Sequence, residues 1–121
     1  MKYLRAANPA RGSVLGTRIG LADRWWLRLR GLMGREQLAR GEGLILRPCR
    51  AIHMRGMTFP LDVAFLDRSG VVVAAYHSIP PGARTKWHRG ARDALELPAG
   101  TLAASGTMVG DTIVLDGDPS P

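Results

Sequence analysis

Four side chains that could bind a metal lie close together near the middle of the chain. Cys49, His53, Met54 and Met57 place a thiol, an imidazole and two thioethers within nine positions. Soft ligands of this kind suit Cu(I), and Cys with His also suits Zn. Methionine more often fills gaps in a core and free cysteine is usually buried, so we expect no metal and no other cofactor. Copper handling by Cys49, His53 and Met57 is kept as a third hypothesis for the function.

Asp62 offers acid–base chemistry directly after this cluster. It stands between Leu61 and Val63 at the start of an apolar run. A carboxylate there can act as a general base if burial raises its pKa, and Asp62 with His53 would then be the candidate catalytic pair of a small hydrolase. An Asp in such a place more often accepts backbone N–H bonds and holds a turn. We therefore predict that Asp62 is at least partly buried and bonded to backbone N–H groups, to Arg35, or to both.

The candidate ligand-binding set extends beyond the catalytic pair and comprises Arg35, His53, Met57, Asp62 and Trp87. Arg35 follows Gly34 and could anchor an anion, cap a helix or pair with Asp62. Trp87 lies in the basic segment from Arg84 to Arg89, which could stack on and neutralise a phosphate-bearing ligand. We favour a solvated loop in which Trp87 folds over the core.

Other catalytic arrangements have less support in the sequence. Glu96 stands between Leu95 and Leu97 and is expected to point outward from a one-sided strand, although a carboxylate pair with Asp62 formed by folding stays open. Cys49 and His53, four positions apart, would share a strand face but lie too far apart to bond directly. The chain contains neither a serine nucleophile elbow nor a phosphate-binding glycine motif. The sequence therefore favours a binding protein over an enzyme.

The elements that must position these residues are expected to be mainly strands. Leu61, Val63 and Phe65 share one face by the two-residue period of a strand, and the Asp67–Gly70 turn joins this strand to the next. Strands are predicted over residues 13–21, 44–46, 61–67, 71–77, 94–97 and 112–115. Asp23 fits a helix N-cap, and apolar spacing predicts a short helical segment from Arg24 to about residue 32. Residues 1–12 end in a loop signal, and no strand is predicted there.

Length and composition indicate one globular domain over residues 1–121, with a loose tail over 116–121. Apolar residues make up 45% of the 121 positions, which is normal for a folded protein. The chain has no run of eighteen apolar residues and no apolar segment after its charged N-terminus. We therefore expect no transmembrane segment, no signal peptide and a cytoplasmic location, and the single cysteine agrees with that compartment.

Positive charge is concentrated in the first half of the chain. Residues 1–60 carry twelve basic and three acidic side chains, whereas residues 61–121 carry five basic and seven acidic ones. A basic patch can recruit phosphates, anionic lipid or an acidic partner. No nucleic-acid recognition motif accompanies the charge, so we do not expect nucleic-acid binding.

Three segments resemble the domain of unknown function 192 family, whose members are uncharacterised small β-rich prokaryotic proteins. They are Gly31–Glu36, then His53 through Met57 to Asp67 with Gly70, and finally Leu95–Gly100 with Gly110–Asp111. Their order and spacing match the family over about residues 12–115. The resemblance implies a mainly β, jelly-roll-like sandwich with a small helical segment near the N-terminus. It implies no reaction.

These observations lead to a mainly β fold, a jelly-roll-like sandwich or barrel with a short N-terminal helical segment. The leading hypothesis for function is a non-catalytic accessory or ligand-binding module for an unknown small molecule or protein partner. The alternative is a small hydrolase-type enzyme that uses Asp62 and His53. A cleft without convergent ionisable groups would favour binding, and a cleft that holds both residues would favour catalysis.

Overall fold

The computed structural model describes residues 1–24, 27–28, 32, 35 and 37–117, and they form a seven-stranded mixed sheet. The strand order is β5-β4-β6-β3-β2-β1-β7. The elements are β1 (Tyr3–Asn8), the 3-10 turn η1 (Pro9–Arg11), β2 (Ser13–Ala22), β3 (Glu42–Leu46), β4 (Leu61–Leu66), β5 (Val72–Ile79), β6 (Asp93–Pro98), α2 (Thr101–Ser105) and β7 (Val114–Gly117). The mainly β prediction is confirmed. None of the helices among the described residues is long and apolar enough to span a membrane.

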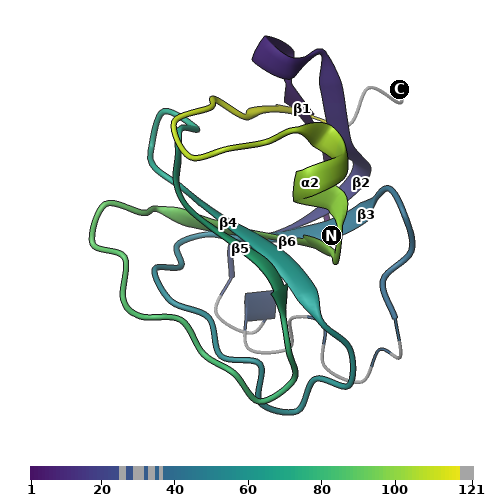
Figure 1. The fold of residues 1–121 in the computed structure, drawn as a ribbon, viewed down its shortest axis with the longest axis vertical. Coiled ribbons are helices and arrows are strands. Elements are labelled where there is room, and N and C mark those ends of the chain that lie inside the picture. Colours follow the sequence, from purple (N-terminus) through teal and green to yellow (C-terminus); the bar gives the residue numbers. More distant parts are fainter. Residues whose placement is uncertain (25–26, 29–31, 33–34, 36, 118–121) are drawn as a thin grey trace.

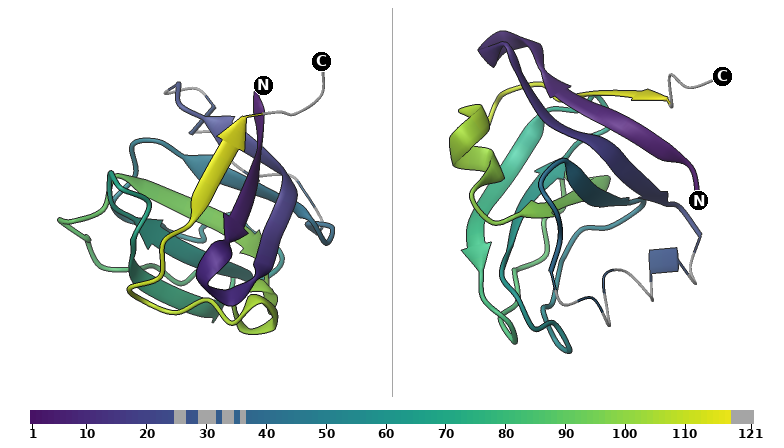
Figure 2. Two further views of the ribbon diagram at one scale, coloured as in Figure 1. Left: turned by 90° about the horizontal axis from the view of Figure 1, so that it is seen from above. Right: turned by 90° about the vertical axis from the view of Figure 1, so that its right-hand side faces the viewer.

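The sheet curls until its two edges meet, as Figures 1 and 2 show. Val71 and Thr112 form an isolated antiparallel bridge, and the Val72 N–H donates to the Asp111 carbonyl over 2.8 Å. All strand pairs are antiparallel except β2 with β3. The described strands form one mixed sheet, so the jelly-roll-like sandwich or barrel expected from the sequence is not confirmed. The long connection between β2 and β3 permits the parallel crossover, and strand periodicity alone does not reveal it.

The side chain of Asp111 ties the loop before β7 to β1 and to η1. One carboxylate oxygen accepts hydrogen bonds from the Asn8 amide and from Arg11 Nε, each over 3.0 Å. The other oxygen accepts a bond from the Arg11 guanidinium over 3.1 Å. The Arg11 guanidinium holds the pKa of the Asp111 carboxyl well below its usual range. The end of β1 and the loop before β7 are therefore tied together by charge-assisted hydrogen bonds.

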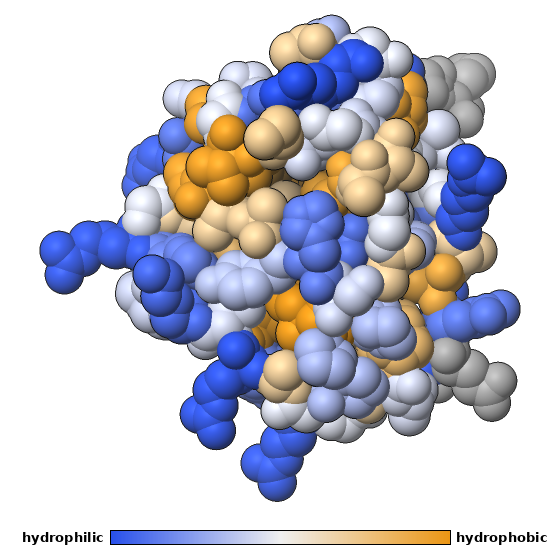
Figure 3. Space-filling view, viewed as in Figure 1, coloured by the Kyte–Doolittle hydropathy of each residue, from blue (hydrophilic) through white to orange (hydrophobic). Residues whose placement is uncertain are grey.

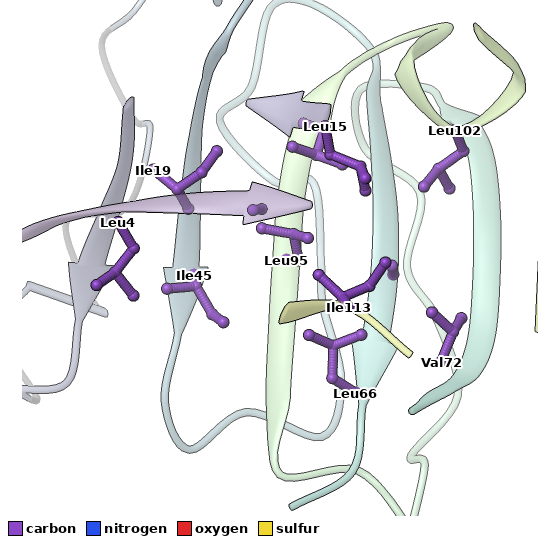
Figure 4. Packing of buried hydrophobic residues seen from close by; sticks show 12 residues of the cluster. Leu4, Leu15, Ile19, Ile45, Leu66, Val72, Leu95, Leu102 and Ile113 are labelled. Carbon is purple, nitrogen blue, oxygen red and sulfur yellow. The ribbon is translucent and has the colours of Figure 1, made fainter. Parts of the chain in front are cut away.

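Two apolar clusters lie on the opposite faces of the sheet. The interior cluster draws on all strands from β1 to β6 and on α2, as Figure 4 shows. It consists of Leu4, Ala6, Leu15, Ile19, Ile45, Ala64, Leu66, Val72, Leu95, Leu97, Leu102 and Ile113. The second cluster, which we call the covered face, includes Leu61, Val63 and Phe65 and lies under the loops that contain Ile52 and Met54. The central strands are therefore buried on both sides.

Most of the predicted strands are present, and the hairpin of β4 and β5 is confirmed. The Gly70 N–H donates to the Asp67 carbonyl over 3.0 Å, as expected of the turn. Two elements were not predicted, namely β1 and α2. With five residues, α2 is too short to show a helical period. The expected helix near the N-terminus is not found within the described residues. The α-helix with defined bounds there is α2, which lies near the C-terminus. The expected segment from Arg24 to Leu32 lies largely outside the described residues, and the Arg28 N–H donates to the Arg24 carbonyl.

The close approach of β3 to its neighbours generates a stability prediction for Gly43. A Cβ atom there would lie 2.7 Å from the Glu96 carbonyl oxygen and 2.8 Å from Ile19 Cδ1. Because these central strands cannot separate without loss of hydrogen bonds, Gly43→Ala should destabilise the fold by roughly 1–3 kcal/mol. Urea denaturation measures the change. Gly90→Ala is the matched control, since nothing lies within 4 Å of its added Cβ, and equal stability of the two variants would contradict the prediction.

Candidate functional site

A groove of about 590 Å³ runs between β2 and the segment that contains α2. One wall is Ser13–Thr17 of β2, and the other consists of Pro98–Thr101 with Ala104 and Ser105. Arg40 and Gly41, which precede β3, close one side. Figure 1 shows α2 above the sheet beside β2. This volume lies in the range of small-molecule sites, which is about 300–1,000 Å³.

The lining of the groove is apolar and hydroxylic, with Arg40 as its one ionisable side chain. Arg40 is exposed and forms no ion pair with any other part of the described chain. The Ser13 hydroxyl donates to the Ser105 carbonyl over 2.8 Å and joins the two walls. The lining also contains the hydroxyls of Thr17, Thr101 and Ser105, and that of Ser105 donates to the Leu102 carbonyl over 3.2 Å. The groove can therefore hold an amphipathic molecule with one anionic group.

Asp62 fixes the wall that carries α2. Its side chain is fully buried, and one oxygen accepts N–H bonds from Gly100 over 3.1 Å and from Leu102 over 2.9 Å. The other oxygen accepts the N–H of Ser78 over 2.8 Å. Ser78 has φ of 51°, a left-handed conformation that costs free energy for a residue with a side chain. Asp62 thus stabilises both a distorted part of β5 and the start of α2, and the prediction of a buried Asp62 bonded to backbone N–H groups is confirmed.

The structure does not bring the proposed partners of Asp62 to it. Arg35 pairs with Glu42, with 3.0 Å between Arg35 Nη2 and Glu42 Oε1, so of the alternatives for Asp62 the backbone N–H bonds form and the Arg35 pair does not. His53 is exposed and contributes its backbone to a bridge with Arg84. Among the described residues there is no contact between Asp62 and His53, and neither residue lines the groove. The geometry gives no support to this pair as an acid–base unit.

Glu96 is the unexpected ionisable group of the fold. It lies on β6 opposite Val63 and Leu44 and is only 7% exposed. Its carboxyl has no hydrogen-bond partner anywhere in the described part of the chain, and burial raises its pKa to about 7. The expectation that it points outward is wrong, because β6 packs on the interior cluster through Leu95 and on the covered face through Ala94.

Asp62 and Glu96 do not form the carboxylate pair that the sequence left open. Val63 and Glu96 are register partners and share the covered face. Asp62 precedes Val63 by one residue and therefore points to the interior face. A glycosidase-like arrangement needs two carboxyls in one cleft, where they flank the bond to be cleaved. Asp62 and Glu96 lie on opposite faces of the sheet and cannot form it.

The candidate metal ligands separate into different environments. Met57 packs against the covered face, and Cys49 is half-buried with its thiol donating to the Ala51 carbonyl over 3.1 Å. Burial raises the pKa of the Cys49 thiol, which disfavours the thiolate needed for metal binding or nucleophilic attack. His53 is exposed. Within the described residues, no group of three His, Cys, Asp or Glu side chains could hold a metal ion.

The basic loop before β6 differs from its predicted form and contains a residue that sequence reasoning missed. Trp87 is 67% exposed, so it does not fold over the core. His88 takes that place, with 4.6 Å between its ring centroid and that of Phe65. Its Nε2 lies 2.6 Å from the Tyr76 hydroxyl, and partial burial lowers its pKa. No sequence signal distinguished His88 from the exposed residues beside it.

Comparison with known proteins identifies the family. The sequence profile of the domain of unknown function 192 family (DUF192), described as an uncharacterised ACR family, matches residues 6–115. The chain belongs to this family. No curated protein matches the chain.

Two solved structures resemble this DUF192 protein in fold. A protein of unknown function from Novosphingobium aromaticivorans has a TM-score of 0.78 and 23% identity, with 93% of this chain and 83% of that chain covered. A proposed transcription regulator from Sinorhizobium meliloti has a TM-score of 0.78 and 24% identity, with 94% and 92% covered. Identities at this level show a shared fold and carry no activity over to this chain.

Two of the family-like segments, the one that begins at His53 and Leu95–Gly100, meet around β4 and β6. These strands pair Asp62 with Leu97 and Val63 with Glu96. The segment that begins at His53 covers their outer face through Met54, which is fully buried. Residues 98–100 then lead from β6 into the groove wall. These two segments therefore support one wall of the groove, and neither of them contains Arg40.

The Asp62 network predicts a large loss of stability on substitution. Asp62→Ala leaves three buried or part-buried N–H donors without their carboxylate, and removal of one partner of a buried charged interaction costs roughly 3–5 kcal/mol. Asp62→Asn should lose less stability, because the amide keeps one oxygen that can still accept backbone N–H bonds. Thermal and urea denaturation measure both, with the exposed Asp116→Ala as control. Melting of both Asp62 variants at or above the parent temperature would contradict this structural role.

Burial of Glu96 predicts a pH-dependent stability with a definite sign. The folded-state pKa of about 7 exceeds the ordinary value of 4.5, so the folded protein binds this proton more tightly than the unfolded chain. The stability of the parent should therefore fall as the pH rises from about 4.5 to 7, by about 3 kcal/mol, and stay level above that range. Glu96→Gln should not lose stability in this way, because its side chain does not ionise. The free energy of unfolding of the variant minus that of the parent should increase over this interval.

Glu42→Gln provides a control of opposite sign when the denaturation series is extended below pH 4.5. The backbone N–H of Ala39, and after it Arg35, lowers the pKa of Glu42. The parent therefore loses this stabilisation as the pH falls through the folded-state pKa of Glu42. If the difference in free energy of unfolding between Glu96→Gln and the parent is constant from pH 4.5 to 8, the Glu96 carboxyl is solvated.

Proposed function

We propose that this protein is a non-catalytic module that binds a small organic anion in the groove between β2 and α2. The observation that carries the proposal is the lining itself, in which Arg40 is the one ionisable side chain. Catalytic sites commonly bring ionisable groups together, whereas a binding site needs an apolar surface and a few polar groups that fix orientation. The candidate catalytic residues Asp62 and His53 are not part of this lining.

The chemistry of the walls defines the class of ligand. Val14, Leu15 and Ala104 offer apolar contact for the body of the ligand, and the hydroxyls of Thr17 and Thr101 offer hydrogen bonds. No carboxylate lines the groove, so an anionic group opposite Arg40 meets no repulsion from the lining. A monocarboxylate with a short apolar body satisfies these conditions, since guanidinium and carboxylate pair in a two-pronged geometry.

The rigidity of the groove favours binding without rearrangement. Asp62 fixes Gly100 and Leu102 in one wall, and the Ser13–Ser105 hydrogen bond links that wall to β2. The Thr17 N–H donates to the Gly41 carbonyl over 3.0 Å and holds the turn beside Arg40. A preformed site loses less conformational entropy when a ligand binds.

The binding prediction uses benzoate and hexanoate as probes, with benzamide and hexanamide as neutral counterparts. At least one of the two acids should raise the melting temperature and shift the NMR signals of residues 13–17 and 98–105, and its amide should bind more weakly. Arg40→Gln should weaken binding of that acid roughly tenfold, because a hydrogen bond to a charged group contributes roughly 1.5–3 kcal/mol. Isothermal titration calorimetry measures the affinities.

Two substitutions on α2 distinguish the groove from other surfaces. Ala104 lines the groove, so Ala104→Trp should fill it and abolish binding. Ala103 is exposed on the same helix outside the lining, and Ala103→Trp should bind as the parent does. Undiminished binding to Ala104→Trp would contradict the proposed site.

A further inference from the structure

A second hollow, of about 260 Å³, lies at the other end of β6 and is lined by four arginines. The lining comes from three loops and consists of Arg50, Asp67, Arg68, Ser69 and Arg89–Arg92. The four cations and one carboxylate leave an excess of three positive charges in the lining. Figure 3 shows long hydrophilic side chains projecting from the left and lower edge of the molecule, and in the same view Figure 1 shows the loop that leads to β6 along this edge. The hollow shares no residue with the groove.

Two of the four guanidinium groups are held in place by the protein. Arg92 directs Nε and Nη2 to the two carboxylate oxygens of Asp93, each over 3.1 Å. Arg47 binds the same carboxylate through two bonds of 2.9 Å, and Asp93 is only 1% exposed. Arg50 Nε donates to the Ala91 carbonyl over 2.9 Å. These bonds fix the cations and leave other N–H groups of Arg50 and Arg92 available to a ligand.

The other two arginines have no partner in the described protein. Arg68 and Arg89 are exposed, and neither forms a hydrogen bond or ion pair with its side chain. Asp67, the acidic member of the lining, forms no ion pair with either of them. One of its oxygens accepts the N–H of Ser69 over 2.8 Å and of Val71 over 2.9 Å, which engages it in the turn.

We propose that this hollow binds a phosphate monoester, with its phosphoryl group between Arg50, Arg68, Arg89 and Arg92. A guanidinium presents a planar fork of donors that matches phosphate oxygens, and several such forks can surround a tetrahedral dianion. A single carboxylate would leave most of these donors unused. The volume admits the phosphoryl group together with the first atoms of its carrier.

The proposal does not depend on the groove ligand. β4 and β6 run antiparallel, so Asp93 and Leu66 pair at one end of these strands, whereas Pro98 and Leu61 pair at the other. The arginine-lined hollow belongs to the first end and the groove to the second. Each site can therefore be tested while the other is intact.

The test is a calorimetric titration with inorganic phosphate and with glycerol 3-phosphate, at a fixed ionic strength of about 0.15 M set with chloride, where charges separated by more than about 8 Å are screened. Arg68→Gln/Arg89→Gln removes the two unpartnered cations and should weaken binding at least tenfold. Arg55→Gln/Arg84→Gln is the control, because it removes the same charge from exposed arginines outside the hollow. It should change the affinity less than twofold.

The two probes distinguish the source of the phosphoryl group. Tighter binding of glycerol 3-phosphate than of inorganic phosphate assigns a phosphorylated small molecule, and equal binding assigns free phosphate. The single variants Arg68→Gln and Arg89→Gln should each show part of the loss, with unchanged circular dichroism. Equal losses in the two double variants, or no saturable binding of either probe, would overturn the proposal. So would a site that binds a single-stranded oligonucleotide through Arg68 and Arg89 while it binds neither phosphate compound.

Discussion

The buried carboxylate of Asp62 is the interaction on which the groove depends. It accepts three backbone N–H bonds from two separate segments of the chain, one in β5 and one at the start of α2. A carboxylate in an apolar interior is stable only when such donors surround it. The carboxylate also fixes backbone N–H groups that are not paired within the sheet, including that of Ser78 with its left-handed conformation. Without it, neither the distortion in β5 nor the position of the Gly100 turn would be held.

Three buried acids in adjacent strands show how surroundings determine the behaviour of one functional group. Asp62 is matched by backbone donors, and Asp93 is matched by two arginines that contact it from different loops. Glu96 has no donor within the described residues, and burial raises its pKa to about 7. The first two carboxyls have hydrogen-bond donors around them, whereas burial without a donor raises the pKa of the third and favours its neutral form.

β6 connects the two candidate sites, because each of its ends leads into one of them. Asp93 at its start orients Arg92 beside the arginine-lined hollow, and Pro98 at its end begins one wall of the groove. The strand is covered on both faces, so it provides a rigid support between them. Sites placed on loops next to such a scaffold can differ among relatives while the fold is retained.

Local patterns in the sequence predicted the elements whose signals are local, and the tertiary structure determined the rest. The alternation at Leu61, Val63 and Phe65 and the turn at Gly70 specified the central hairpin, and the family resemblance was confirmed over residues 6–115. Burial of Glu96 could not be predicted, since alternation says which residues share a face but not whether both faces are covered. The parallel pairing of β2 with β3, the groove and the hollow required long-range contacts, because their residues come from segments far apart in the chain. The sequence did single out the basic segment that ends at Arg89, but it gave no signal for Arg50 or Arg68. Only the tertiary structure brings the charges of the three loops to one place.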